Sequence, residues 1–198
     1  MSTSEVDPGA RLMLAWQQGD ETALDRIVER YSAPVFALLT RFLGPVARRE
    51  DLVQEVFLRL VRVRDRYQPS VRFSTWLYRI VFNLAANERE PSRSLGDGTA
   101  GAADSAEGGA SREPNDAGVL LASEAVERDD EVRAVQDAIA GLPVRQRMAL
   151  ILAKYEGLPY AEIGEVLGSN ERAVKSMVER ARQSLRLTLS RYLAEEQA

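Results

Sequence analysis

Apolar residues recur every three or four positions in the first half of the chain, the spacing of a helix with one buried face. The first such run begins at Glu21, with Asp20 as a candidate N-cap residue. Pro34 predicts a kink or a restart inside this run, and Gly44-Pro45 predicts its end. Its inward positions before the proline are Leu24, Ile27, Val28 and Tyr31.

Two further helices are predicted before residue 91. One spans the fifties and stops at Tyr67-Gln68-Pro69, and the other starts near Ser74 and ends at Pro91. The inward positions of the first are Leu52, Val53, Val56, Phe57 and Leu60. Those of the second are Leu77, Ile80, Val81 and Leu84.

Residues 92–118 interrupt the pattern, because they contain few apolar side chains and are rich in Gly, Ala, Ser and acidic residues. Such a segment cannot bury enough apolar surface to offset the entropy of ordering it, so we expect residues 91–127 to be a flexible linker. Helical spacing of apolar residues resumes over 128–194. No run of residues alternates between polar and apolar for long enough to predict a strand. The sequence therefore predicts an all-α protein with two small helical domains, residues 10–90 and 128–194, joined by a flexible linker.

The composition removes several classes of chemistry. The 198 residues include no cysteine and no histidine, which excludes disulfides, thiolate metal sites and Ser/His or Cys/His nucleophile pairs. We therefore expect no enzymatic activity, no metal and no cofactor. No apolar run approaches the roughly 18–20 residues of a membrane span, and the polar start does not resemble a signal peptide. These features predict a soluble, cytoplasmic protein with no membrane insertion.

Residues 160–182 have the pattern of a helix-turn-helix. A short helix with Ile163, Val166 and Leu167 inward meets Gly168, which tolerates a left-handed turn. Although the whole chain has a net charge of −4, residues 171–191 carry six basic and two acidic side chains. This excess favours the second helix as a reader of the DNA major groove over a solvated bundle helix. Its outward residues are Arg172, Lys175, Ser176, Glu179, Arg180 and Arg182.

Aromatic, cationic and amide side chains are interleaved between residues 67 and 90. On a helix starting near Ser74, one face combines Trp76, Arg79, Asn83 and Asn87, and the loop before it contains Tyr67, Gln68, Ser70 and Arg72. Single-stranded nucleic acid is held by this mixture, because bases stack on aromatics and amides read their edges. The alternative is that the aromatic residues are core and the asparagines are ordinary polar surface.

The helix before it has a second distinctive face, formed by Asp51, Gln54, Glu55, Leu58 and Arg62. Acidic residues beside an exposed leucine can dock an arginine-rich partner helix. A solvated face is the alternative interpretation.

Four segments together resemble the bacterial extracytoplasmic-function (ECF) sigma factors of the sigma-70 family. They are DLVQEVFLRL (51–60), FSTWLYRIVFN (73–83), LPVRQRMALIL (142–152) and YAEIGEVLGSNERAVKSMVERAR (160–182). The resemblance covers nearly the whole chain apart from the linker, and it implies a dissociable specificity subunit of RNA polymerase. The implied partners are core RNA polymerase, promoter DNA and an anti-sigma factor.

The resemblance also implies a role for each face. The acidic helix of the family docks on core polymerase, which points to Asp51, Leu52, Gln54 and Glu55. The −10 element, captured as a single strand, corresponds by match to Tyr67, Gln68, Ser70, Arg72, Trp76, Arg79, Asn83 and Asn87. The −35 element is read as duplex, which would use Arg172, Lys175, Ser176, Glu179, Arg180 and Arg182.

The chain also departs from the family pattern. ANEREPSRS stands where many members have a run of arginines, and the recognition helix has Met177 and Glu179 where an arginine and an aromatic residue or histidine are common. Since an acid can accept from a cytosine amino group, the −35 sequence is expected to be atypical. A stand-alone helix-turn-helix regulator is the alternative function, but it leaves the pattern of residues 51–87 unexplained.

Overall fold

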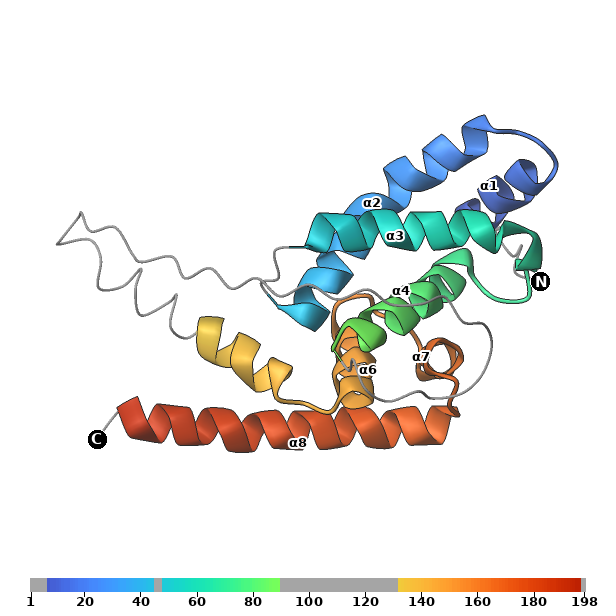
Figure 1. Ribbon diagram of the computed structural model, residues 1–198. Helices are drawn as coiled ribbons and strands as arrows, with labels where there is room; N and C mark the ends of the chain where they lie inside the picture. The colour runs from blue at the N-terminus through green and yellow to red at the C-terminus, as the bar shows by residue number, and fades with distance from the viewer. Residues whose placement is uncertain (1–6, 45–47, 90–131, 197–198) are drawn as a thin grey trace, which may run out of the picture.

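The structure is a computed structural model that describes residues 7–44, 48–89 and 132–196, with side chains up to residue 190. The regular secondary structure of these residues consists of helices alone, with no strand, which confirms the all-α prediction (Figure 1). The expected linker, residues 91–127, lies outside the described part. The elements are α1 (Pro8–Gln17), α2 (Thr22–Leu43), α3 (Arg49–Arg62), the 3-10 helix η1 (Arg64–Arg66), α4 (Phe73–Arg89), a helix over residues 132–140, α6 (Val144–Lys154), α7 (Tyr160–Leu167) and α8 (Glu171–Glu196).

The first helix, α1, was not predicted. The Asp7 side chain accepts from the Gly9 backbone N–H at 3.1 Å, and Pro8 occupies the first helical position. A capping residue followed by proline is a typical helix start, so this signal was present in the sequence. Met13 and Trp16 on the inner face are fully buried.

Helix α2 continues through Pro34 as one element, so the predicted restart was wrong. Buried residues lie on the same face before and after the proline, including Tyr31, Val35 and Leu38. Packing of both halves against one core therefore outweighs the hydrogen bond that the proline removes. The helix begins at Thr22 with Glu21 at the N-cap position, one residue later than predicted, and the Asp20 side chain accepts from the backbone N–H of Thr22 at 3.1 Å.

Helices α2, α3 and α4 enclose the core of the N-terminal domain. Each contributes residues at helical spacing, for example Ile27 from α2, Val56 from α3 and Leu77 from α4, none of which has exposed surface. The C-terminal domain has its own core between α6, α7 and α8, with Leu152, Ile163 and Val174 fully buried. Two helical domains are therefore present, as predicted. None of the described helices has the length and apolarity to cross a membrane.

The two domains pack directly on each other, a contact that was not predicted. Helix α7 packs against α4, and α6 reaches α2 (Figure 1). At the second contact Arg147, only 1% exposed, donates from Nη1 to the Phe42 carbonyl at 3.1 Å. Its guanidinium lies 5.5 Å from the centre of the Phe42 ring.

Candidate nucleic-acid and polymerase interfaces

The turn between α7 and α8 has the geometry of a helix-turn-helix. Gly168 is left-handed, with φ of 58°, and the Ser169 N–H donates to the Gly164 carbonyl at 2.8 Å. The Asn170 side chain then caps α8 by accepting from the Ala173 N–H at 2.8 Å. The predicted role of Gly168 is confirmed, and the short turn fixes the direction in which α8 leaves α7.

Helix α8 presents the expected polar face. Val174, Val178 and Ala181 are at most 1% exposed and anchor the helix to α6 and α7. The opposite face contains five exposed residues of the predicted −35 set and the half-buried Ser176. The exposed five are Arg172, Lys175, Glu179, Arg180 and Arg182. Arg180 donates to the Ser176 hydroxyl at 2.8 Å, so these two side chains form one polar unit.

Helix α4 presents Arg79, Asn83 and Asn87 on one exposed face. Trp76 lies at the edge of this face and is half-buried, with its ring centroid 5.1 Å from that of Tyr67. A half-buried indole at the end of an amide row retains a surface on which a base can stack.

The loop before α4 divides into buried and exposed residues. Gln68, Ser70 and Arg72 are exposed, whereas Tyr67 is 3% exposed and stacks edge-on against Phe73. The ring of Tyr67 therefore belongs to the core and is not on the predicted binding surface. Burial and the nearby Asp7 carboxylate raise the pKa of Tyr67 to about 12, so this phenol is neutral at physiological pH.

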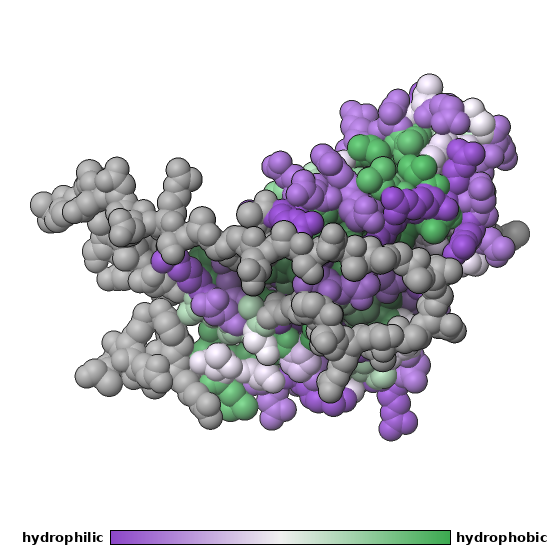
Figure 2. Space-filling view, viewed as in Figure 1, coloured by the Kyte–Doolittle hydropathy of each residue, from purple (hydrophilic) through white to green (hydrophobic). Residues whose placement is uncertain are grey.

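The predicted docking face of α3 is only partly as expected. Asp51 and Gln54 are exposed and Leu58 is 52% exposed, but Leu52 is 4% exposed and packs in the core. Positions 52, 56 and 60 follow the buried stripe of the helix, which explains why Leu52 points inward. Figure 2 shows mainly hydrophilic residues along α3.

Of the two carboxylates on this face, that of Glu55 is already paired with arginines of its own helix. It accepts from the Arg59 guanidinium at 2.8 Å and lies 3.7 Å from that of Arg62. The acidic character expected for the face is therefore partly neutralised by the arginines of α3 itself.

The contact between the domains is built from carboxylates of the C-terminal domain. Glu162 on α7 accepts from the Thr75 hydroxyl at 2.8 Å and lies 3.7 Å from the Arg72 guanidinium. Glu156 accepts from the Tyr78 hydroxyl at 2.8 Å, and burial, together with this bond, raises the pKa of Tyr78. Sequence reasoning missed these pairs, which join residues far apart in the chain.

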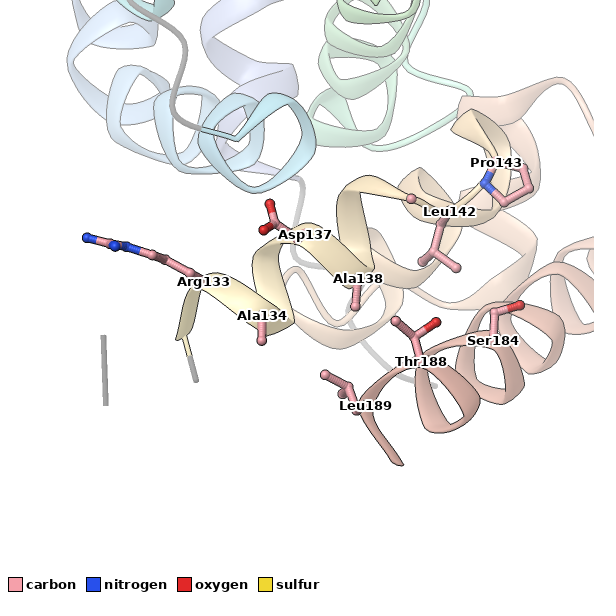
Figure 3. A pocket seen from close by; sticks show the side chains of 10 residues that line it. Arg133, Ala134, Asp137, Ala138, Leu142, Pro143, Ser184, Thr188 and Leu189 are labelled. Carbon is pink, nitrogen blue, oxygen red and sulfur yellow. The ribbon is translucent and has the colours of Figure 1, made fainter. Parts of the chain in front are cut away.

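A groove of about 600 Å³ lies between the helix over residues 132–140 and α8. Ala134, Ala138 and Leu142 face Thr188 and Leu189 across it (Figure 3). It lies along the C-terminal half of α8, away from the exposed residues between Arg172 and Arg182.

The fold and these surfaces define a two-domain helical protein with a helix-turn-helix at its C-terminal end. The family model for sigma-70 region 2 matches residues 27–90, and the model for sigma-70 region 4 matches residues 132–185. Among curated relatives, the RNA polymerase sigma-H factor of Pseudomonas aeruginosa is 32% identical, covering 98% of this chain and all of that protein. The ECF RNA polymerase sigma-E factor of Escherichia coli K12 is 34% identical, covering 85% of this chain and 87% of that protein.

Two solved structures share the fold. CnrH in complex with the cytosolic domain of CnrY has a TM-score of 0.62 at 21% identity, covering 92% of this chain and 94% of that one. RpoE from Bartonella quintana, bound to the anti-sigma factor NepR, has a TM-score of 0.59 at 21% identity, covering 84% of this chain and 96% of that one. The chain belongs to the sigma-70 family of RNA polymerase sigma factors, as an ECF-type member. It directs core polymerase to promoters, and the stand-alone regulator is not favoured.

Proposed function

We propose that the two domains divide promoter recognition between them, with boundaries at residues 10–90 and 128–194. The N-terminal domain captures the −10 element as a single strand, and the C-terminal domain reads the −35 element as duplex. The observation that supports this division is the pair of exposed polar faces, one on α4 and one on α8, each on a domain that matches a different sigma-70 region.

The −10 strand is assigned to the exposed face of α4 and to the loop before it. Arg79, Asn83 and Asn87 offer one cation and two amides, and Trp76 offers a stacking surface at their edge. Gln68, Ser70 and Arg72 extend this surface into the loop. The buried ring of Tyr67 packs against Phe73 and anchors the start of the loop to the core.

The −35 duplex is assigned to the exposed face of α8, where one acidic side chain lies among basic ones. Arg172, Lys175 and Arg182 supply cations for phosphates, while Glu179 and Arg180 are placed to discriminate between bases.

Core polymerase is assigned to the exposed part of α3. Asp51, Gln54 and Leu58 form its accessible surface, with Glu55 beside them and Leu52 supporting the helix from the core. An anti-sigma factor is a further partner, supported by the two fold relatives whose structures are complexes. We infer no catalytic activity, because the relatives are specificity factors, and we place the protein in the cytoplasm, where core polymerase acts.

Co-elution with core RNA polymerase on a sizing column tests the proposal. The purified chain is expected to shift to the volume of the polymerase. A chain that elutes alone but binds duplex DNA would contradict the proposal and favour a stand-alone regulator.

Replacing Asn83 with alanine is expected to reduce promoter opening about tenfold while leaving polymerase binding unchanged, since one amide contact to an exposed base contributes about 1–3 kcal/mol. Asn83 is exposed, so the substitution should not disturb the core. Opening is measured by permanganate reactivity of unpaired thymines on a promoter selected from random DNA by the wild-type holoenzyme. Loss of polymerase binding would instead assign Asn83 to docking.

Replacing Arg180 with alanine is expected to weaken binding to the −35 duplex about tenfold. Activity on a template whose −10 region is already melted should be unchanged. The exposed Arg186, further along α8, provides a matched control of equal charge. Binding is measured with fluorescent duplexes at fixed salt, because phosphate contacts are strongly salt-dependent. Equal losses on duplex and premelted templates would refute the assignment.

A further inference from the structure

Helix α1 is joined by hydrogen bonds to both ends of the loop over residues 67–72, hereafter the −10 loop. At the start of the loop, Gln17 donates from Nε2 to the carbonyls of Arg64 at 2.6 Å and Tyr67 at 3.1 Å. At its end, the Asp7 carboxylate accepts from the backbone N–H of Phe73 at 2.5 Å. The bonded residues are 47, 50 and 66 positions apart in the chain.

The Asp7 carboxylate caps two helices at once. One oxygen accepts from Gly9 at the start of α1, and the other accepts from Phe73 at the start of α4. Negative charge is stabilised at both helix N-termini, and charge-assisted hydrogen bonds are stronger than neutral ones. The relative position of α1 and α4 is therefore fixed where the −10 loop ends.

Close packing prevents α1 from sliding along its neighbours. A Cβ atom at Gly9 would lie 2.3 Å from the Tyr31 hydroxyl and 2.6 Å from Cδ1 of Phe73, so the helix backbone lies directly on both rings. At the other end of α1, the Arg64 guanidinium lies 5.3 Å from the centre of the buried Trp16 ring. Figure 1 shows α1 at the same end of the molecule as η1 and the start of α4.

We propose that Asp7 and Gln17 are positioning residues for promoter opening, which act by holding the −10 loop in a shape ready to accept a base. A loop fixed at both ends loses less conformational freedom when it binds its ligand, so less of the binding free energy is spent on ordering it. This inference rests on the proposed role of the loop at the −10 element. Neither residue touches DNA in this account.

The test combines loop mobility with promoter opening. Because the chain has no cysteine, Ser70→Cys places a single spin label on the loop of the full-length free protein. Gln17→Ala and Asp7→Ala are expected to increase the mobility of this label. Asp7→Asn, whose single amide oxygen can keep the bond from Phe73 while losing the one from Gly9, should keep the label less mobile than Asp7→Ala does. Gln18→Ala is the matched control, since Gln18 is the exposed neighbour of Gln17.

Promoter opening is then measured for the same substitutions without the label, in holoenzyme on the selected promoter. Gln17→Ala and Asp7→Ala are expected to reduce opening on the order of tenfold, with unchanged polymerase binding and with recovery in Asp7→Asn. Unchanged label mobility in both alanine variants would overturn the inference. Increased mobility with normal opening would also overturn the inference, because the hydrogen bonds of Asp7 and Gln17 would then hold the loop without aiding opening. Failure of the proposed function is distinguished from both outcomes, since it would show as normal opening by Asn83→Ala or as a wild-type chain that does not bind polymerase.

Discussion

Replacing Arg147 with alanine is expected to lower the free energy of unfolding by about 3–5 kcal/mol, because a buried, hydrogen-bonded cation is lost and its partners are left unsatisfied. The Arg147 guanidinium donates to the carbonyls of Phe42 and Leu142 at 3.1 and 2.8 Å, and also to that of Ala140. The bond to Phe42 joins the end of α2 to the C-terminal domain, whereas the bonds to Ala140 and Leu142 lie within that domain. Urea unfolding followed by circular dichroism measures the loss.

Lys154→Ala is the matched control for this experiment, because it removes one positive charge from an exposed position of the same helix. Its effect is expected to stay within about 0.5 kcal/mol. If Arg147→Ala behaved like Lys154→Ala, the hydrogen bonds of Arg147, including the one that crosses to Phe42, would not contribute to stability in solution.

Replacing Gly164 with alanine is expected to lower the free energy of unfolding by about 1–3 kcal/mol and to weaken −35 duplex binding by about tenfold or more. A Cβ atom at this position would lie 2.6 Å from the Ser169 carbonyl oxygen, a backbone atom that cannot rotate away. The turn has to widen, which tilts α8 away from its docking direction. Fluorescence anisotropy with the selected duplex measures the change in binding.

Gly141→Ala is the control for this substitution, since its added Cβ atom would lie at an ordinary 3.5 Å from the nearest backbone oxygen. It should leave duplex binding unchanged. Normal binding by Gly164→Ala would show that the turn tolerates widening and that its tight geometry does not set the reading angle.

The sequence predicted features that depend on local spacing. The stripe of Val174, Val178 and Ala181 and the left-handed Gly168 follow from helical period and turn chemistry, and the structure confirms both. Helix α1 could have been predicted from Asp7-Pro8, but its short apolar pattern is weaker than that of the later helices.

Features that depend on tertiary packing could not be predicted in the same way. Tyr67 was assigned to a binding face, yet its burial is decided by the elements that surround it. Leu52 was predicted inward from helical spacing and is buried, so the match with the family, which placed it on the docking face, was wrong there. The pairing of Thr75 with Glu162, 87 positions apart, leaves no periodic signal in the sequence. The division of α4 between an exposed face and a face covered by α7 is likewise a property of the assembled domains.

The contact between Thr75 and Glu162 also limits the distance between the exposed face of α4 and that of α8. Since Glu162 and Arg172 are ten residues apart, Thr75 and Arg172 lie within about 40 Å of each other in the packed arrangement. Duplex DNA rises about 3.4 Å per base pair, so 40 Å corresponds to roughly 12 base pairs. On the proposed assignment, a molecule in the packed arrangement can therefore engage two sites on one duplex only where they lie within roughly 12 base pairs of each other. A chain of 42 residues is at most about 150 Å long, so the length between residues 89 and 132 would permit the two faces to engage sites farther apart than the packed arrangement allows.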